Sequence, residues 1–151
     1  MVEIRIATSD DVEYVARYLR SSDYKELSLS HGDPAEAIRN SVNGSLWTKS
    51  ALLDGVPVLI YGLHPSVMDS AGVPWMVATD QIAEIGSRFV LGSLSEIEIM
   101  QHIYPFLYNQ VHCENHLSIR WLRWLGFTVD ETPCGPQNAF FYFWRRSCVK
   151  Q

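Results

Sequence analysis

The stretch NHLSIRWLRWLGF, residues 115–127, decides the fold that the sequence predicts. Its apolar residues recur every three or four positions, as they do on the side of a helix that packs against a core. The residues expected on that side are Leu117, Trp121, Trp124 and Leu125, and Ile119 and Leu122 widen the apolar zone. Gly126 can adopt the left-handed conformation that ends a helix, and Phe127 can begin a strand. The stretch therefore predicts a buried helix over residues 115–125 that stops sharply before a strand.

Strand and helix patterns extend outward from this stretch. Strand-like segments cover residues 2–7, 46–53, 56–63, 75–78, 106–112, 127–129 and 139–145, and helix-like segments cover residues 8–19, 33–44 and 80–104. Gly86 and Gly92 interrupt the last helix, and Asp54-Gly55 predicts a tight hairpin turn. Consecutive strands predict antiparallel pairs, and the later strand–helix alternation predicts a parallel crossover. We therefore expect an α/β (α+β) fold in a single domain, residues 1–151, with a mixed central sheet of about six to seven strands and helices on both faces.

The composition excludes several classes of protein. Of the 151 residues, 47% are hydrophobic and 19% are charged, which suits a packed globular protein. The formal net charge of −5 disfavours general nucleic-acid binding, because phosphate backbones attract clustered Lys and Arg. No segment approaches the ~18 to 20 apolar residues that span a membrane. The three cysteines form no disulfide framework, which favours a reducing compartment, and we expect a cytoplasmic protein.

The surroundings of Asn115 resemble a motif near the C-terminus of the GNAT acetyltransferases. In that family an Asn ends a strand, a helix follows, and Gly-Phe opens the next strand; Asn115, Gly126 and Phe127 match at that spacing. The resemblance implies a GNAT-like fold in which acetyl-CoA donates its acetyl group to an amine. It also implies that Asn115 contacts the pantetheine arm of acetyl-CoA. The residue type equally fits a strand-end turn in which Asn115 bonds its own backbone.

A narrower resemblance involves three further segments. Residues 72–75, 118–127 and 133–136, the last before an aromatic final strand, resemble small GNAT-like proteins of tailed phages. Some of those proteins are internal virion (core) proteins. The resemblance implies a component of the host cytoplasm that is packaged in a virion and has a phage or host protein as its partner.

The segment after the fourth expected strand departs from the family pattern. GNAT enzymes hold the pyrophosphate of acetyl-CoA on backbone N–H groups of a Gly-rich loop in this place. Residues 79–86 read TDQIAEIG here, and Glu84 stands where the first Gly of that loop should be. The standard loop is therefore absent from the sequence.

A substitute for that loop is a helix start formed by Gly92, Ser93 and Ser95. Ser95 and Glu98 fit a capping box, and the N–H groups at such a start can receive a phosphate. The same residues also fit an ordinary helix cap, so both interpretations remain open.

The catalytic positions are equally incomplete. Many GNAT enzymes have a Tyr that protonates the leaving thiolate, and Leu122 occupies that position here. Leucine cannot donate a proton, so water or another tyrosine, Tyr104 or Tyr108, would have to replace it. Asp80 and Glu84 lie near the end of the fourth strand, where such enzymes often place the base that deprotonates the amine. Both also fit the description of solvated surface carboxylates.

Two hypotheses about function follow. The missing loop and missing Tyr favour a non-catalytic GNAT-fold protein, either an internal virion component or a protein-binding module. The alternative is an acetyl-CoA-dependent N-acetyltransferase that acts on an amine of a protein or small molecule. No metal site is expected, because the potential ligands in residues 112–116 lack a second cluster elsewhere. The aromatic run of residues 140–144 predicts either a strand packed on both faces or an interaction surface.

Overall fold

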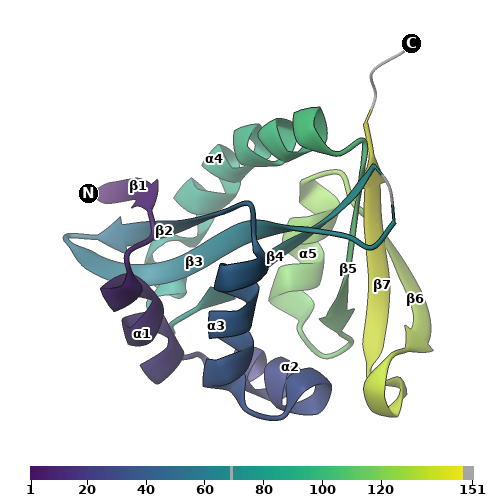
Figure 1. Cartoon of the computed structure of the whole chain (residues 1–151), viewed down its shortest axis with the longest axis horizontal. Helices are drawn as coiled ribbons and strands as arrows, with labels where there is room; N and C mark the ends of the chain where they lie inside the picture. Colours follow the sequence, from purple (N-terminus) through teal and green to yellow (C-terminus); the bar gives the residue numbers. More distant parts are fainter. Residues whose placement is uncertain (69, 148–151) are drawn as a thin grey trace. The chain divides into compact units, whose positions relative to one another are not determined.

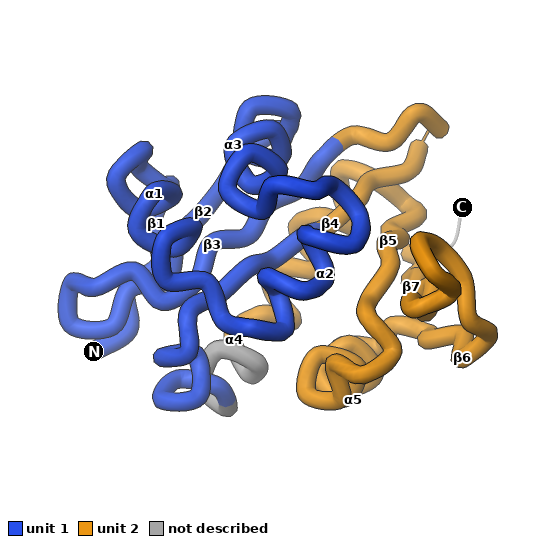
Figure 2. Tube along the Cα trace, turned by 90° about the horizontal axis from the view of Figure 1, so that it is seen from below, with its two compact units in different colours: residues 1–64, 75–87 blue, residues 65–74, 88–151 orange. Residues whose placement is uncertain are grey.

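The structure is a computed structural model that describes residues 1–68 and 70–147, with the backbone alone for residues 87–91. Its contacts group the chain into two compact units, drawn in blue and orange in Figure 2. Unit 1 comprises Met1–His64 and Trp75–Ser87, and unit 2 comprises Pro65–Pro74 and Arg88–Gln151.

Seven strands form a mixed sheet in the order β1-β2-β3-β4-β5-β7-β6 (Figure 1). Their bounds are Val2–Ile6 (β1), Trp47–Leu53 (β2), Val56–Pro65 (β3), Ala71–Ala78 (β4), Phe106–His112 (β5), Thr128–Cys134 (β6) and Phe140–Arg146 (β7). The pairs β1–β2, β2–β3, β5–β7 and β6–β7 are antiparallel, and β4–β5 is parallel. The predicted mixed sheet is confirmed.

The helices are Ser9–Arg17 (α1), Ser21–His31 (α2), Pro34–Gly44 (α3), Ile82–Ile103 (α4) and His116–Trp124 (α5), with a short 3₁₀ helix at Pro136–Asn138. In unit 1, α1 and α3 lie on one face of β2 and β3, and the first turns of α4 lie on the other (Figure 1). Helices on both faces of the sheet are therefore confirmed. No helix in the described part of the chain is long and apolar enough to cross a membrane.

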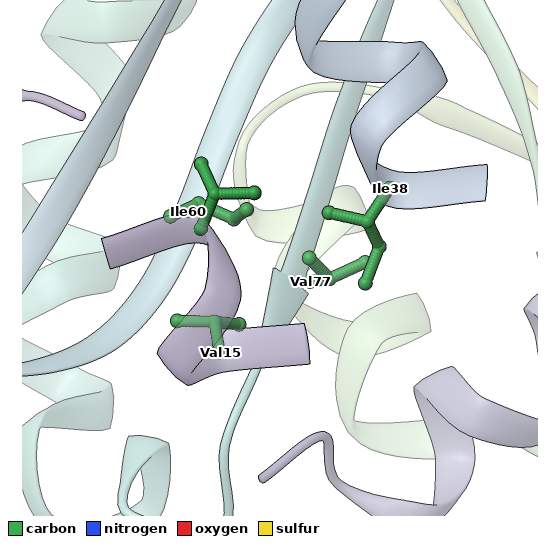
Figure 3. Close-up of a cluster of buried hydrophobic side chains, with 5 residues drawn as sticks. Val15, Ile38, Ile60 and Val77 are labelled. Carbon is green, nitrogen blue, oxygen red and sulfur yellow. The ribbon is translucent and has the colours of Figure 1, made fainter. Parts of the chain in front are cut away.

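A cluster of buried branched side chains forms the core of unit 1. Figure 3 shows Val15 of α1, Ile38 of α3, Ile60 of β3 and Val77 of β4 pointing toward one another. Together with Val12, these side chains are almost completely buried. Burial of this kind contributes about 1.5–3 kcal/mol for each aliphatic side chain. The cluster holds α1 and α3 against β3 and β4.

Local signals explain where the elements of unit 1 begin and turn. Thr8 and Asp11 form a capping box, in which the Thr8 hydroxyl accepts from Asp11 N and the Asp11 carboxylate accepts from Thr8 N, both at 3.1 Å. This pair satisfies N–H groups that would otherwise lack partners at the start of α1. Asp54 and Gly55 both have positive φ, of 50° and 83°, as the predicted hairpin turn between β2 and β3 requires.

Unit 2 contains the stretch from which the fold was predicted. Ile119 of α5 is buried, and Phe127 packs edge-on against Phe143 of β7 with ring centroids 5.2 Å apart. Gly126 has a φ of +89°, so the chain turns from α5 toward β6 through the left-handed conformation that was expected. The predicted order of strand, Asn, helix, Gly and strand is confirmed.

Several details differ from the prediction. Helix α2 was missed, because its polar and apolar residues form no stripe and its N-cap residue, Arg20, makes no side-chain cap. Strands β4 and β6 are longer than expected. The buried side of α5 was only partly right: Ile119 and Leu125 are buried as expected, whereas Trp124 is 51% exposed.

Candidate functional site

A pocket of about 350 Å³ lies in unit 1, between α1 and the residues that follow β4. Tyr14 comes from α1, Tyr18 is the C-cap residue of that helix, Leu19 follows it, and Asp80 and Gln81 precede α4. The two tyrosine rings lie one turn apart on the helix, with centroids 4.8 Å apart. Asp80, one of the predicted bases, is exposed and therefore accessible to a ligand in this pocket.

Hydrogen bonds to the end of β4 hold the two walls of this pocket together. Arg20 N donates to Ala78 O at 2.8 Å, and Ala78 N donates to the Asp23 carboxylate, also at 2.8 Å. An isolated antiparallel bridge joins Leu19 to Thr79. The segment that carries Tyr18 and Leu19 is thus fixed directly beside the segment that carries Asp80.

A buried ion pair supports this connection. Both side chains are buried, and the Arg20 guanidinium donates two hydrogen bonds to Asp23, at 2.7 and 3.1 Å. Burial raises the pKa of Asp23, while Arg20 and the Ala78 N–H stabilise the charged form against this effect. The Asp23 carboxylate accepts three hydrogen bonds and thereby holds α2 against β4.

The chemistry of the pocket suits a cationic group. A carboxylate attracts an ammonium ion, and the faces of tyrosine rings attract cations through their quadrupole. The Tyr18 ring already contacts one cation, because the Arg17 guanidinium carbon lies 5.6 Å from its centroid. A protonated amine can therefore contact Asp80 and an aromatic ring in the same pocket.

The start of α4 lies beside the pocket, and its backbone N–H groups are paired within the turn. The donor–acceptor distances are 3.3 Å from Gln81 N to Thr79 Oγ1, 3.1 Å from Ile82 N to Thr79 O, 3.3 Å from Ala83 N to Asp80 O and 2.9 Å from Glu84 N to Gln81 O. The carboxylates of Asp80 and Glu84 flank the same turn and would repel an anion. This turn does not fit the pyrophosphate of acetyl-CoA.

Asn115 lies at the end of β5 and caps α5. Its side-chain oxygen accepts a hydrogen bond from Ser118 N at 3.3 Å, and the residue is 8% exposed. This contact satisfies one of the N–H groups at the helix start. Asn115 therefore has the local turn role that its residue type allowed, and the predicted contact with a pantetheine arm remains a prediction.

Solved structures of acetyltransferases match nearly the whole chain. The PaiA N-acetyltransferase from Thermoplasma acidophilum, solved in complex with coenzyme A, has a TM-score of 0.65 at 17% identity, over 97% of this chain and 99% of its own. Ard1 from Thermoplasma volcanium has a TM-score of 0.70 at 14% identity, over 98% and 99%. An acetyltransferase of the GNAT family from Streptococcus pneumoniae has a TM-score of 0.64 at 13% identity, over 97% and 99%. This chain has the GNAT fold.

The match concerns the arrangement of the backbone, because the sequences have diverged almost completely. No protein-family model and no curated protein sequence matches the chain. The GNAT fold that the Asn115 motif predicted is therefore shown by structure, while activity has to be argued from the residues of the site.

The substitute phosphate site expected at Gly92, Ser93 and Ser95 rested on a helix start that does not exist. Helix α4 runs without interruption from Ile82 to Ile103, and the Ser95 hydroxyl donates to Gly92 O at 2.9 Å from within the helix. Interior N–H groups of a helix bond to carbonyl oxygens one turn earlier and are not available to a phosphate. The expected start at residues 92–95 is wrong.

Tyr108, one of the candidate proton donors, lies in unit 2 on an aromatic row of β5 and β7. Its hydroxyl forms a hydrogen bond with Ser66, and its ring lies 5.9 Å from both Phe106 and Tyr142. Burial, together with Tyr108, raises the pKa of Tyr142, although Arg146 opposes the effect. Tyr108 is engaged within this row, and its role in catalysis remains a prediction.

The remaining potential ligands in residues 112–116 have structural contacts. His112 Nδ1 accepts from Glu114 N at 3.1 Å, and the His112 ring packs edge-on against Phe140 with centroids 5.6 Å apart. Within residues 1–68 and 70–147, no three His, Cys, Asp or Glu side chains are grouped so that they could hold a metal ion.

The sequence did not point to several residues of the pocket. Tyr14 and Tyr18 lie beside the stripe that predicted α1, and nothing in their spacing distinguishes them from other surface aromatics. The pair Arg20 and Asp23 carried one signal, an i, i+3 spacing of opposite charges in a polar segment. That signal indicates a surface ion pair far more often than a buried one.

Proposed function

We propose that this chain is a GNAT-fold N-acetyltransferase whose acceptor amine binds in the pocket of Tyr14, Tyr18, Leu19, Asp80 and Gln81. The observation that carries the proposal is the position of Asp80: a carboxylate at the end of β4 that lines a pocket with two tyrosines. The GNAT fold supplies the reaction class, because the solved structures with this fold described above are acetyltransferases. A pocket that suits a cation indicates that the acceptor is an amine.

Each residue of the pocket has a defined part in this proposal. Asp80 pairs with the ammonium form of the acceptor and takes up the proton that the nitrogen must lose before it can attack a carbonyl carbon. Tyr14 and Tyr18 contact the alkyl groups next to the nitrogen and favour the cation. The donor supplies an acetyl group as a thioester: the N–C bond forms, the C–S bond breaks, and the thiolate leaves as a thiol when it takes, through water, the second proton that the nitrogen loses.

Amine binding can be tested without any donor. Calorimetry with n-butylamine, spermidine and a lysine-containing peptide measures the affinity of the pocket in the wild-type chain and in Asp80→Asn. Loss of the ion pair in the variant is expected to weaken binding about 10-fold or more. Glu98→Gln is the matched control, because Glu98 is an exposed carboxylate on α4 that does not line the pocket. Equal affinities in wild type and Asp80→Asn would contradict the assignment.

A second candidate is a GNAT-fold binding module that transfers no acetyl group. It is favoured by the paired N–H groups at the start of α4 and by Leu122, which cannot donate a proton. The resemblance to phage proteins suggests a phage or host protein as its partner. Acetylated product separates the candidates, because only the first forms it.

A further inference from the structure

The backbone around the end of β4 leaves no N–H group directed toward a phosphate over residues 81–84. Each of these four N–H groups donates to an oxygen of Thr79, Asp80 or Gln81. Just before them, Thr79 N donates to Val58 O and Ala78 N donates to Asp23. A phosphate at this turn would have to break one hydrogen bond for each one that it made. Binding there would therefore gain little free energy.

The charge at this turn also opposes an anion. The partial positive charge at a helix start is small and acts only over the first turn. Asp80 and Glu84 place two carboxylates on that turn, and Gln81 between them carries no charge. A pyrophosphate would therefore meet repulsion where the family usually provides attraction.

Helix α4 offers no second start farther along. Gly92 lies inside the continuous helix, and Ser95 bonds back to its carbonyl oxygen. The place where the family has its phosphate loop and the substitute place that the sequence suggested are thus both closed by hydrogen bonds within the chain.

We infer that the start of α4 does not bind the pyrophosphate of coenzyme A, and that the acyl donor of this chain is a thioester whose nucleotide adds nothing to recognition. The inference rests on the proposed function for its donor, but its statement about coenzyme A rests only on the hydrogen bonds and charges at the start of α4. A short acyl-pantetheine thioester serves this protein as well as acetyl-CoA does. The thioester and the acceptor amine then carry all of the specificity.

Two measurements test the inference. The first is the melting temperature with 1 mM coenzyme A, compared with 1 mM pantetheine, which lacks the nucleotide; a ligand that binds the folded state must raise it. No rise beyond that caused by pantetheine is expected, and a clearly larger rise with coenzyme A would overturn the inference. The second is the ratio of kcat/KM for acetyl-CoA to that for acetyl-pantetheine. A ratio within about 3-fold is expected. Two hydrogen bonds from backbone N–H groups to the pyrophosphate would instead make the ratio about 100-fold or more.

The variant Glu84→Gln distinguishes two reasons why the pyrophosphate would not bind: backbone N–H groups that already have acceptors, and repulsion by the carboxylates. The variant removes one carboxylate and leaves the hydrogen bonds of residues 81–84 intact, so coenzyme A should still raise the melting temperature no more than pantetheine does. A larger rise with coenzyme A in Glu84→Gln, absent from the control Glu98→Gln, would show that the backbone N–H groups are available and would overturn the inference. If neither thioester gives product, the proposed acetyltransferase function fails, and the melting temperatures alone decide the inference.

Discussion

Removal of the Asp23 carboxylate should destabilise the chain more than any loss of a surface ion pair. Asp23 accepts three hydrogen bonds, at 2.7 and 3.1 Å from Arg20 and at 2.8 Å from Ala78 N. Asp23→Ala leaves a buried guanidinium and a buried N–H without this acceptor, which costs about 3–5 kcal/mol of unfolding free energy. At about 2–4 °C per kcal/mol for a chain of this size, the melting temperature should fall by roughly 6–20 °C. Urea unfolding at pH 8, followed by circular dichroism and tryptophan fluorescence, measures the loss.

Two comparisons make this prediction refutable. Arg39→Met breaks an exposed pair with Glu13, whose side chains are 52% and 50% exposed, and should change the urea midpoint little. The double variant Arg20→Met with Asp23→Leu replaces the whole pair with apolar groups and should be less destabilised than Asp23→Ala alone. If Asp23→Ala lowers the unfolding free energy no more than Arg39→Met does, the buried pair does not hold α2 against β4.

Three further substitutions test local features of the fold. Gly92→Ala should stabilise the chain by about 0.5–1 kcal/mol if α4 is continuous, since a Cβ there meets nothing within 4 Å; a loss in chemical unfolding would contradict the continuous helix. Gly126→Ala should destabilise it by about 1 kcal/mol or more, because φ is +89° and the added Cβ would lie 3.2 Å from Arg145 Nε; an unchanged urea midpoint would refute this. Asp11→Asn tests pH dependence. Burial raises the pKa of Asp11, but hydrogen bonds from the Thr8 backbone, Arg5 and Ser50 outweigh burial and bring the pKa below 3.8. A lowered folded-state pKa stabilises the chain above the unfolded value, and this contribution is lost as the pH falls through the folded value. The stability difference between wild type and Asp11→Asn should therefore be largest near neutral pH and shrink below pH 3.8, and a difference that grows in acid would contradict the network.

Where local chemistry decides an element, the sequence was sufficient to predict it. The helix start at Thr8, the Asp54-Gly55 turn and the positive φ of Gly126 are each set by residues that are neighbours in the chain. These signals gave the order of most elements and, with Asn115, the GNAT fold. Helix α2 lacked such a signal, because its position depends on Arg20 and Asp23 contacting Ala78, which lies 55 residues from Asp23.

The two glycines of α4 led to the wrong prediction of a break in this helix. Gly86 and Gly92 each cost about 1 kcal/mol in helix propensity, which argued for a break. The tertiary contacts of a long helix outweigh that cost, and buried residues on both sides of Gly92, including Ile85 and Ile97, show that α4 packs along much of its length. The helix start that the sequence suggested at Ser95 therefore never forms.

The candidate site was only partly predictable. Asp80 was named because it follows a strand, and the structure places it in a pocket. Its partners, Tyr14 and Tyr18, lie more than 60 residues earlier and reach it through α1, so no sequence pattern could connect them. The hydrogen bonds that pair the N–H groups of residues 81–84 depend on backbone geometry that residue types do not determine.

The central claim is that Asp80 serves acetyl transfer to an amine, and product formation tests it most directly. The full chain is incubated with acetyl-pantetheine or acetyl-CoA and spermidine, and N-acetylated product is measured by mass spectrometry. Wild type and Glu98→Gln should form product at equal rates, and Asp80→Asn should be slower by about 100-fold or more. Absence of product from every chain, or equal rates in Asp80→Asn and wild type, would contradict the account.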